Sequence, residues 1–143
     1  MNWINKYKRK ARKTKTTGVV LLLVSIICFV SGMALIDSDI SDGWFAFIMI
    51  GWFVNLWVSL FCLFGSKVVY RKYNNDYICV YIAPIKNYLI INNEVQYEGG
   101  MAMWSQYLYG QLPDGTDVAV KLSGFGDVKF AIGSFNNHNV SFF

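Results

Sequence analysis

The chain has 143 residues, of which 55% are hydrophobic and only 15% are charged, and its mean hydropathy is +0.34. Because a soluble globular protein carries about 25% charged residues, this composition excludes an ordinary soluble domain and indicates a membrane protein. The length also excludes a large multidomain enzyme and leaves room for one small domain beside the membrane segments.

The net charge of +4 combines three regions of different sign. Positions 6–15 hold seven basic residues and no acidic ones, positions 37–42 hold three aspartates, and the six basic and six acidic residues after position 65 cancel. The basic character therefore belongs to an N-terminal tail, residues 1–17. The neutral C-terminal region lacks the basic surface that a nucleic-acid backbone requires, so we expect no nucleic-acid partner.

The basic tail precedes the first apolar segment directly, and two roles fit it. The simpler role is to keep the N-terminus on the cytoplasmic side of a membrane. The second role is contact with anionic lipid headgroups. The residues assigned to this contact are Lys6, Lys8, Arg9, Lys10, Arg12 and Lys13.

Two uncharged apolar segments follow, at residues 18–36 and 44–64. At 1.5 Å per residue they extend about 29 and 31 Å, close to the hydrocarbon thickness of a bilayer. Helices buried in soluble proteins rarely run this long without a charged face. The sequence therefore predicts a two-helix transmembrane hairpin over residues 18–64.

The orientation of the hairpin follows from its flanks. The basic tail precedes the first span, only acidic residues occupy the short connection, and Lys67, Arg71 and Lys72 follow the second span. Because short cytoplasmic segments are enriched in Lys and Arg, we expect both termini in the cytoplasm and place the protein in the inner membrane of a bacterium.

Small and polar residues form one stripe on each predicted span. Residues 18, 21, 25, 28 and 32 follow a 3,4,3,4 spacing, and residues 51, 55, 59 and 62 follow a 4,4,3 spacing. Such faces allow helices in lipid to approach closely and to form hydrogen bonds, so we expect association there. The residues assigned to association, within the hairpin and between copies in a homo-oligomer, are Ser25, Gly32, Gly51, Asn55 and Ser59.

Asn55 is the most polar residue of these stripes and lies near the middle of the second span. Its amide requires a hydrogen-bond partner where water is scarce. Three arrangements remain open: a bond to Ser25 or to a carbonyl within the hairpin, a bond between copies of the chain, and the lining of a water-filled pathway.

No residue pattern indicates catalysis, a cofactor or a metal site. The three cysteines, Cys28, Cys62 and Cys79, lack the spacing of a disulfide framework, and the single His138 has no second histidine or cysteine at ligand spacing. There is also no Gly-x-Ser-x-Gly motif. We therefore expect a protein without enzymatic activity.

From residue 65 to 143 the periodicity becomes that of strands. Apolar residues alternate with others around positions 78–82, 117–122 and 128–132, and clusters of Asn, Asp, Gly and Pro separate these segments. The clearest hairpin joins residues 107–112 to residues 116–122. The pattern predicts a small antiparallel all-β cytoplasmic domain of six or seven strands, closed as a barrel or packed as a sandwich.

Five aromatic residues mark a candidate ligand or partner face on this domain: Tyr77, Tyr81, Trp104, Tyr107 and Tyr109. Aromatic side chains on a strand face stack on flat ligands such as a nucleotide base. The alternative is ordinary cross-strand pairing on a half-exposed sheet.

The leading hypothesis is a non-enzymatic membrane protein that self-associates through its hairpin and binds a protein partner through its β domain. The layout resembles that of small bacterial defence effectors, in which a β-barrel senses a cyclic nucleotide and the spans disrupt the membrane. It also resembles that of small exclusion proteins of phages and mobile elements. These resemblances imply two alternative functions, a ligand-gated membrane effector and an exclusion protein. A third alternative is an accessory subunit of an envelope or transport machine.

Overall fold

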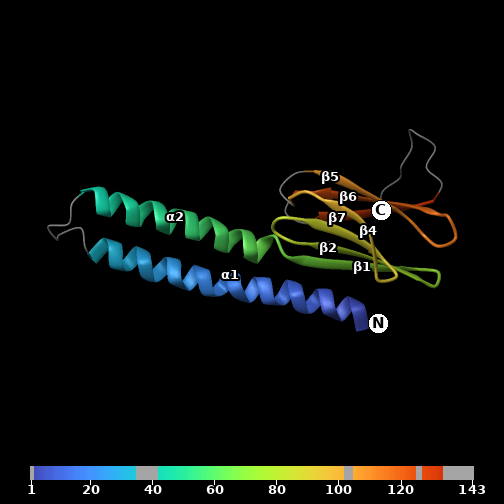
Figure 1. The fold of residues 1–143 in the computed structure, drawn as a ribbon, viewed down its shortest axis with the longest axis horizontal. Coiled ribbons are helices and arrows are strands. Elements are labelled where there is room, and N and C mark those ends of the chain that lie inside the picture. The colour runs from blue at the N-terminus through green and yellow to red at the C-terminus, as the bar shows by residue number, and fades with distance from the viewer. Residues whose placement is uncertain (1, 35–41, 102–104, 125–126, 134–143) are drawn as a thin grey trace.

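The computed structural model describes residues 2–34, 42–101, 105–124 and 127–133. Two long helices, α1 (Asn2–Ala34) and α2 (Asp42–Phe64), run side by side and extend from a β region that follows them in the chain (Figure 1). Within the described residues the strands are β1 (Lys67–Tyr73), β2 (Asp76–Ile82), β3 (Asn87–Ile91), β4 (Glu94–Gly99), β5 (Gln106–Gln111), β6 (Asp117–Ser123) and β7 (Asp127–Ile132).

Both helices are long and apolar enough to cross a membrane. Helix α2 begins two residues before the predicted segment and ends at the same residue, where the Gly65 amide donates to the Phe61 carbonyl at 2.8 Å. Helix α1 is 33 residues long, because the basic residues predicted to form a tail continue the same helix as the first apolar segment. The end of that segment, residues 35–36, lies outside the described residues.

The strands form two antiparallel sheets, a four-stranded sheet in the order β1-β2-β3-β4 and a three-stranded sheet in the order β5-β6-β7. The strands predicted around positions 78–82, 117–122 and 128–132 are confirmed as β2, β6 and β7, and the predicted hairpin is β5 and β6. In its turn the Leu112 amide donates to Thr116 and the Gly115 amide donates to Leu112, with Gly115 at φ +86°. Glycine adopts this backbone conformation without a steric penalty.

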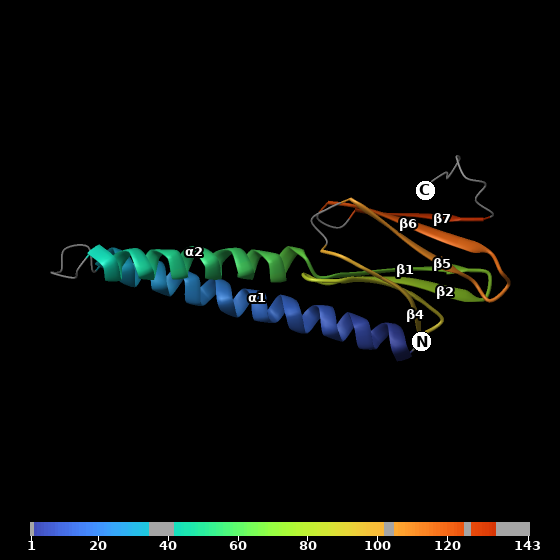
Figure 2. The same cartoon turned by 45° about the horizontal axis from the view of Figure 1, so that its top comes forward.

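The two sheets share one hydrophobic core and form a sandwich (Figure 2). The four-stranded sheet contributes fully buried Val80 and Leu89, and the three-stranded sheet contributes fully buried Leu108 and Val120. Among the described residues the sheets do not close into a barrel, so the sandwich alternative is the one observed.

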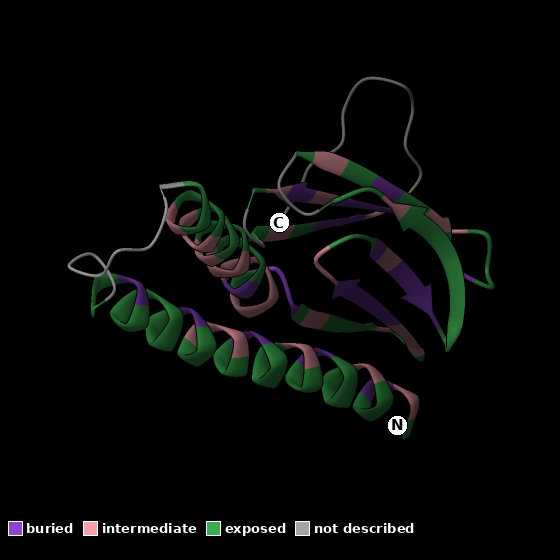
Figure 3. Cartoon of the chain, turned by 60° about the vertical axis from the view of Figure 1, so that its left-hand side comes forward, coloured by how far each residue is buried: buried purple, intermediate pink, exposed green. Residues whose placement is uncertain are grey.

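Helix α1 adds a third layer, because its N-terminal half covers β2 and the adjoining residues of β1 and β3 on the outer face of the four-stranded sheet. Strand β2 is consequently buried on both faces: Ile78, Cys79, Val80, Tyr81 and Ile82 are each at most 2% exposed. Figure 3 shows this burial on the strands, and it shows buried positions recurring at intervals along α1.

Candidate functional site

The buried residues of α1 lie seven positions apart along the whole helix. They are Ile4, Ala11, Gly18, Ser25 and Gly32. Seven residues are nearly two helical turns, so these positions share one face that drifts by about 20° per heptad. We call this face the contact stripe. Ala11 faces the sheet and the last three members face α2, so one helix face joins the hairpin to the sandwich.

Aromatic rings flank the contact stripe where α1 meets the sheet. The ring of Tyr7 lies 5.6 Å from that of Tyr81 on β2, and Trp3 packs edge-on against Tyr7 at 6.4 Å. On the sheet, Tyr81 stacks on Tyr88 of β3 at 5.8 Å. Ala11 joins this cluster because a methyl group lets the helix backbone approach the strands closely.

Two lysines of α1 add cation–π contacts to this interface. The Nζ of Lys8 lies 4.4 Å from the ring centroid of Tyr70, and the Nζ of Lys10 lies 5.7 Å from that of Tyr81. Contacts of this kind contribute about 0.5–1 kcal/mol each at exposed sites. Part of the basic sequence therefore serves the packing of α1 on the sheet.

Three ionisable groups at the contact between α1 and the sheet have pKa values shifted toward their neutral forms. Burial raises the pKa of the Cys79 thiol to about 12, and the charge of Lys8 acts in the opposite direction. Burial also raises the pKa of Tyr7 and that of Tyr81, the latter against a hydrogen bond with Thr14. All three shifts have the same main cause, which is that water is displaced from the contact between helix and sheet.

Within the hairpin, Asn55 finds its partners on α1. Its Nδ2 donates to the Ser25 Oγ at 2.7 Å and to the Leu21 carbonyl at 3.2 Å. The buried Ser59 Oγ donates to the Leu56 carbonyl of its own helix at 2.8 Å. Of the three arrangements open for Asn55, the structure contains the bond within the hairpin.

The glycines of the predicted stripes differ in their surroundings. A Cβ on Gly18 would lie 2.9 Å from the Leu63 Cγ and 3.0 Å from the Cys62 Cβ, so α2 approaches α1 more closely there than at Gly32. A Cβ on Gly32 would meet its nearest neighbour, in Ile48, at 3.9 Å. Gly51 is exposed, and a Cβ there would meet no atom within 4 Å. Gly51 therefore takes no part in packing within the hairpin.

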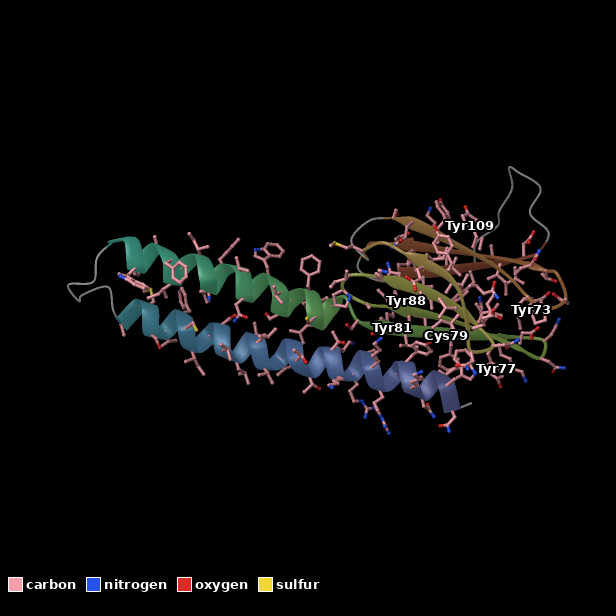
Figure 4. All side chains as sticks on the ribbon, viewed as in Figure 1. Tyr73, Tyr77, Cys79, Tyr81, Tyr88 and Tyr109 are labelled. Carbon is pink, nitrogen blue, oxygen red and sulfur yellow. The ribbon has the colours of Figure 1, made fainter. Side chains whose placement is uncertain are left out.

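The predicted aromatic face is divided between the two outer surfaces of the sandwich. Tyr77 and Tyr81 lie on β2 at the α1 side, where Tyr81 is 2% exposed, whereas Tyr107 and Tyr109 lie on β5. Figure 4 shows Tyr109 on the side of the sandwich opposite Cys79 and Tyr81. Trp104, the fifth residue of the predicted face, lies outside the described residues. The structure therefore does not bring these tyrosines together.

Tyr107 and Tyr109 form an exposed pair on the three-stranded sheet. Their rings stack with centroids 6.3 Å apart, and the side chains are 41% and 54% exposed. The Nζ of Lys121 on β6 lies 5.7 Å from the ring centroid of Tyr107. We call this surface, with the neighbouring Gln111 on the same strand face, the tyrosine face.

A pocket that the sequence did not predict lies where the hairpin meets the sandwich. It has a volume of about 670 Å³ and lies between α1, the end of α2 and the β2–β3 connection. We call it the elbow pocket. Its lining includes Lys10, Thr14, Val58, Phe61, Tyr81 and Ile85. No sequence signal marks it, because these residues come from three separate segments that only the fold brings together.

Among the residues that the structure describes, no cluster of three His, Cys, Asp or Glu side chains is placed to hold a metal ion. His138 lies outside them. Comparisons of the chain with protein-family models, with curated proteins and with solved structures found no match.

Proposed function

We propose that this protein is a non-enzymatic membrane anchor whose hairpin spans the inner membrane of a bacterium and holds the β-sandwich at its cytoplasmic face, where the sandwich binds a protein partner. The observation that carries the proposal is the continuity of α1, which runs from the apolar hairpin onto the sheet without a break. A helix of this kind fixes the position of the sandwich relative to the membrane.

The surface of the hairpin supports membrane insertion. Large apolar side chains point outward along both helices; Val20, Ile27 and Phe47 are 54%, 64% and 68% exposed. A contiguous apolar surface of this size is unfavourable in water and is suited to lipid. The distribution of basic and acidic flanks supports placing both termini in the cytoplasm.

This proposal changes which basic residues reach the lipid headgroups. If Gly18 marks the edge of the hydrocarbon, Lys13 lies about 8 Å and Lys6 about 18 Å beyond it along the helix axis. The headgroup layer is only about 5–8 Å thick on each side. Arg12 and Lys13 are therefore suited to direct lipid contact, and Lys10, about 12 Å beyond Gly18, reaches the headgroup layer only through its long side chain. Lys6, Lys8 and Arg9 start farther out, beside the sandwich.

The tyrosine face is the surface we propose for the protein partner. Helix α1 covers the middle of the outer face of the four-stranded sheet, whereas Tyr107 and Tyr109 on the opposite surface remain exposed. Stacked tyrosines offer a large contact area at a low cost in side-chain entropy, and tyrosine is enriched among the residues that dominate binding energies. Because the tyrosines do not converge on one platform, no observation favours the nucleotide-sensing alternative.

Crosslinking in cells tests the partner proposal. We expect a photoreactive amino acid in place of Gln111 to form a discrete adduct with one protein. Tyr109→Ser in the same chain should reduce that adduct by tenfold or more, since such residues contribute about 2 kcal/mol or more to binding. The matched control is Tyr97→Ser, which removes an exposed tyrosine on β4 in the other sheet and should leave the adduct unchanged. An adduct that survives Tyr109→Ser contradicts this assignment of the partner surface.

A further inference from the structure

The elbow pocket has an apolar end beside the hairpin and a polar end beside the sandwich. Gly18 of α1 lies next to Cys62 and Leu63 of α2, which fixes the relative height of the two helices. Relative to this level, Val58 lies about 6–8 Å toward the hairpin and Lys10 about 12 Å toward the sandwich, at 1.5 Å per residue. In a membrane-anchored chain, the pocket therefore crosses the boundary between hydrocarbon and headgroups.

The chemistry of the lining changes in the same direction. Val58 and Phe61 of α2 form the wall near the hairpin, and Ile85 of the β2–β3 connection is 69% exposed beside them. The hydroxyl of Thr14 and the ammonium group of Lys10 lie toward the sandwich, on successive turns of α1. This order matches a molecule with an acyl chain at one end and a polar group at the other.

The charged residues around the pocket favour an anionic ligand. None of the described residues that line it is acidic, and α1 carries seven basic residues and no acidic ones. Lys86, the second lysine of the lining, is paired with Glu98 at 3.0 Å, whereas Lys10 has no recorded carboxylate partner among the described residues. Lys10 is therefore the cation available to a phosphate group.

We propose that the elbow pocket binds an anionic phospholipid of the surrounding leaflet, with its phosphate at Lys10 and its acyl chain along Val58, Phe61 and Ile85. This inference rests on the proposed membrane anchoring. A phospholipid is the expected occupant, because the pocket crosses the boundary between hydrocarbon and headgroups and the bilayer supplies phospholipid at that level.

Photolabelling in vesicles tests this site. The full-length protein is reconstituted in phosphatidylcholine containing a minor fraction of phosphatidylglycerol, with a trace of either lipid carrying a photoreactive group in its acyl chain. We expect the phosphatidylglycerol probe to label the peptides that contain Phe61 and Ile85 more strongly than the phosphatidylcholine probe does. Lys10→Gln should lower that labelling about fivefold, as expected for loss of one basic residue near anionic lipid.

Two controls separate this inference from the anchoring on which it rests. Lys6→Gln removes the same charge from the same helix outside the elbow pocket and should leave the labelling unchanged. Labelling at Ile27, on the exposed surface of the hairpin, should be the same in all variants. Equal labelling of the pocket by both probes, unaffected by Lys10→Gln, overturns the lipid site while anchoring stands. Absence of labelling at Ile27 overturns the anchoring itself.

Discussion

Replacement of Ala11 by lysine is expected to release the N-terminal half of α1 from the sheet and to destabilise the sandwich. Ala11 is 7% exposed and packs against Cys79, Tyr81 and Ile90. A lysine there places four methylene groups and a charge in a contact sized for one methyl group, next to other cations. We expect a loss of about 2–4 kcal/mol in the free energy of unfolding.

The melting temperature of the sheet signal in circular dichroism measures this loss in the full-length protein. For a domain of this size we expect a decrease of roughly 10 °C or more. The matched control is Asn5→Lys, which makes the same charge change at an exposed position on the other side of the same helix half. Equal melting temperatures for the two variants would mean that the contact contributes nothing to the stability of the sandwich.

Replacement of Gly18 by leucine is expected to separate the two helices of the hairpin. Even a Cβ at this position would lie 2.9 Å from the Leu63 Cγ and 3.0 Å from the Leu63 backbone nitrogen, and the backbone cannot move aside cheaply. Overpacking of this kind costs about 1–3 kcal/mol. Unfolding by sodium dodecyl sulfate in mixed micelles should therefore require less detergent.

Trp52 provides the signal for this measurement, because its ring lies 4.9 Å from that of Phe29 on the other helix. The control is Gly51→Leu, at a position where a Cβ meets no atom within 4 Å, and it should leave the unfolding midpoint unchanged. A lower midpoint for Gly51→Leu would contradict the hairpin packing. A change in oligomeric state with an unchanged midpoint would instead place a second copy of the chain at Gly51, as the predicted self-association requires.

The apolar segments and the strands were predictable from the sequence because each has a strong local signal. The helices show uninterrupted apolar runs of the right length, and the strands show a period of two with turn residues between them. For Asn55 the sequence predicted the need for a hydrogen bond and left three arrangements open. A buried amide requires a partner, but which partner it finds depends on how the helices are paired.

The docking of α1 on the sheet was not predicted, although a sequence signal for it exists. The 3,4,3,4 spacing at residues 18–32 continues upstream through Ile4, Tyr7, Ala11 and Thr14, all of which are buried or half-buried. This upstream spacing was overlooked because seven basic residues surround it, and such a basic segment is usually interpreted as a solvated tail. The division of the tyrosines was not predictable, because strand periodicity places residues on two faces without indicating which face a helix covers.

The accessibility of Cys79 tests the central claim, that α1 is one helix docked on the sheet, most directly. In a chain carrying Cys28→Ala and Cys62→Ala, Cys79 is the remaining thiol, and it is completely buried beneath α1. Burial raises its pKa from an ordinary value of 9.0 to about 12, so the reactive thiolate is about a thousandfold scarcer at neutral pH.

We expect a water-soluble maleimide to label Cys79 very slowly in membrane vesicles whose cytoplasmic face is outside. Ala11→Lys, which undocks α1, should accelerate the labelling many-fold, and Asn5→Lys should not. The contradicting result concerns the single-cysteine chain that keeps Ala11. If its Cys79 were labelled as fast as in the urea-unfolded protein, the sheet face would be uncovered and α1 would not be docked on it.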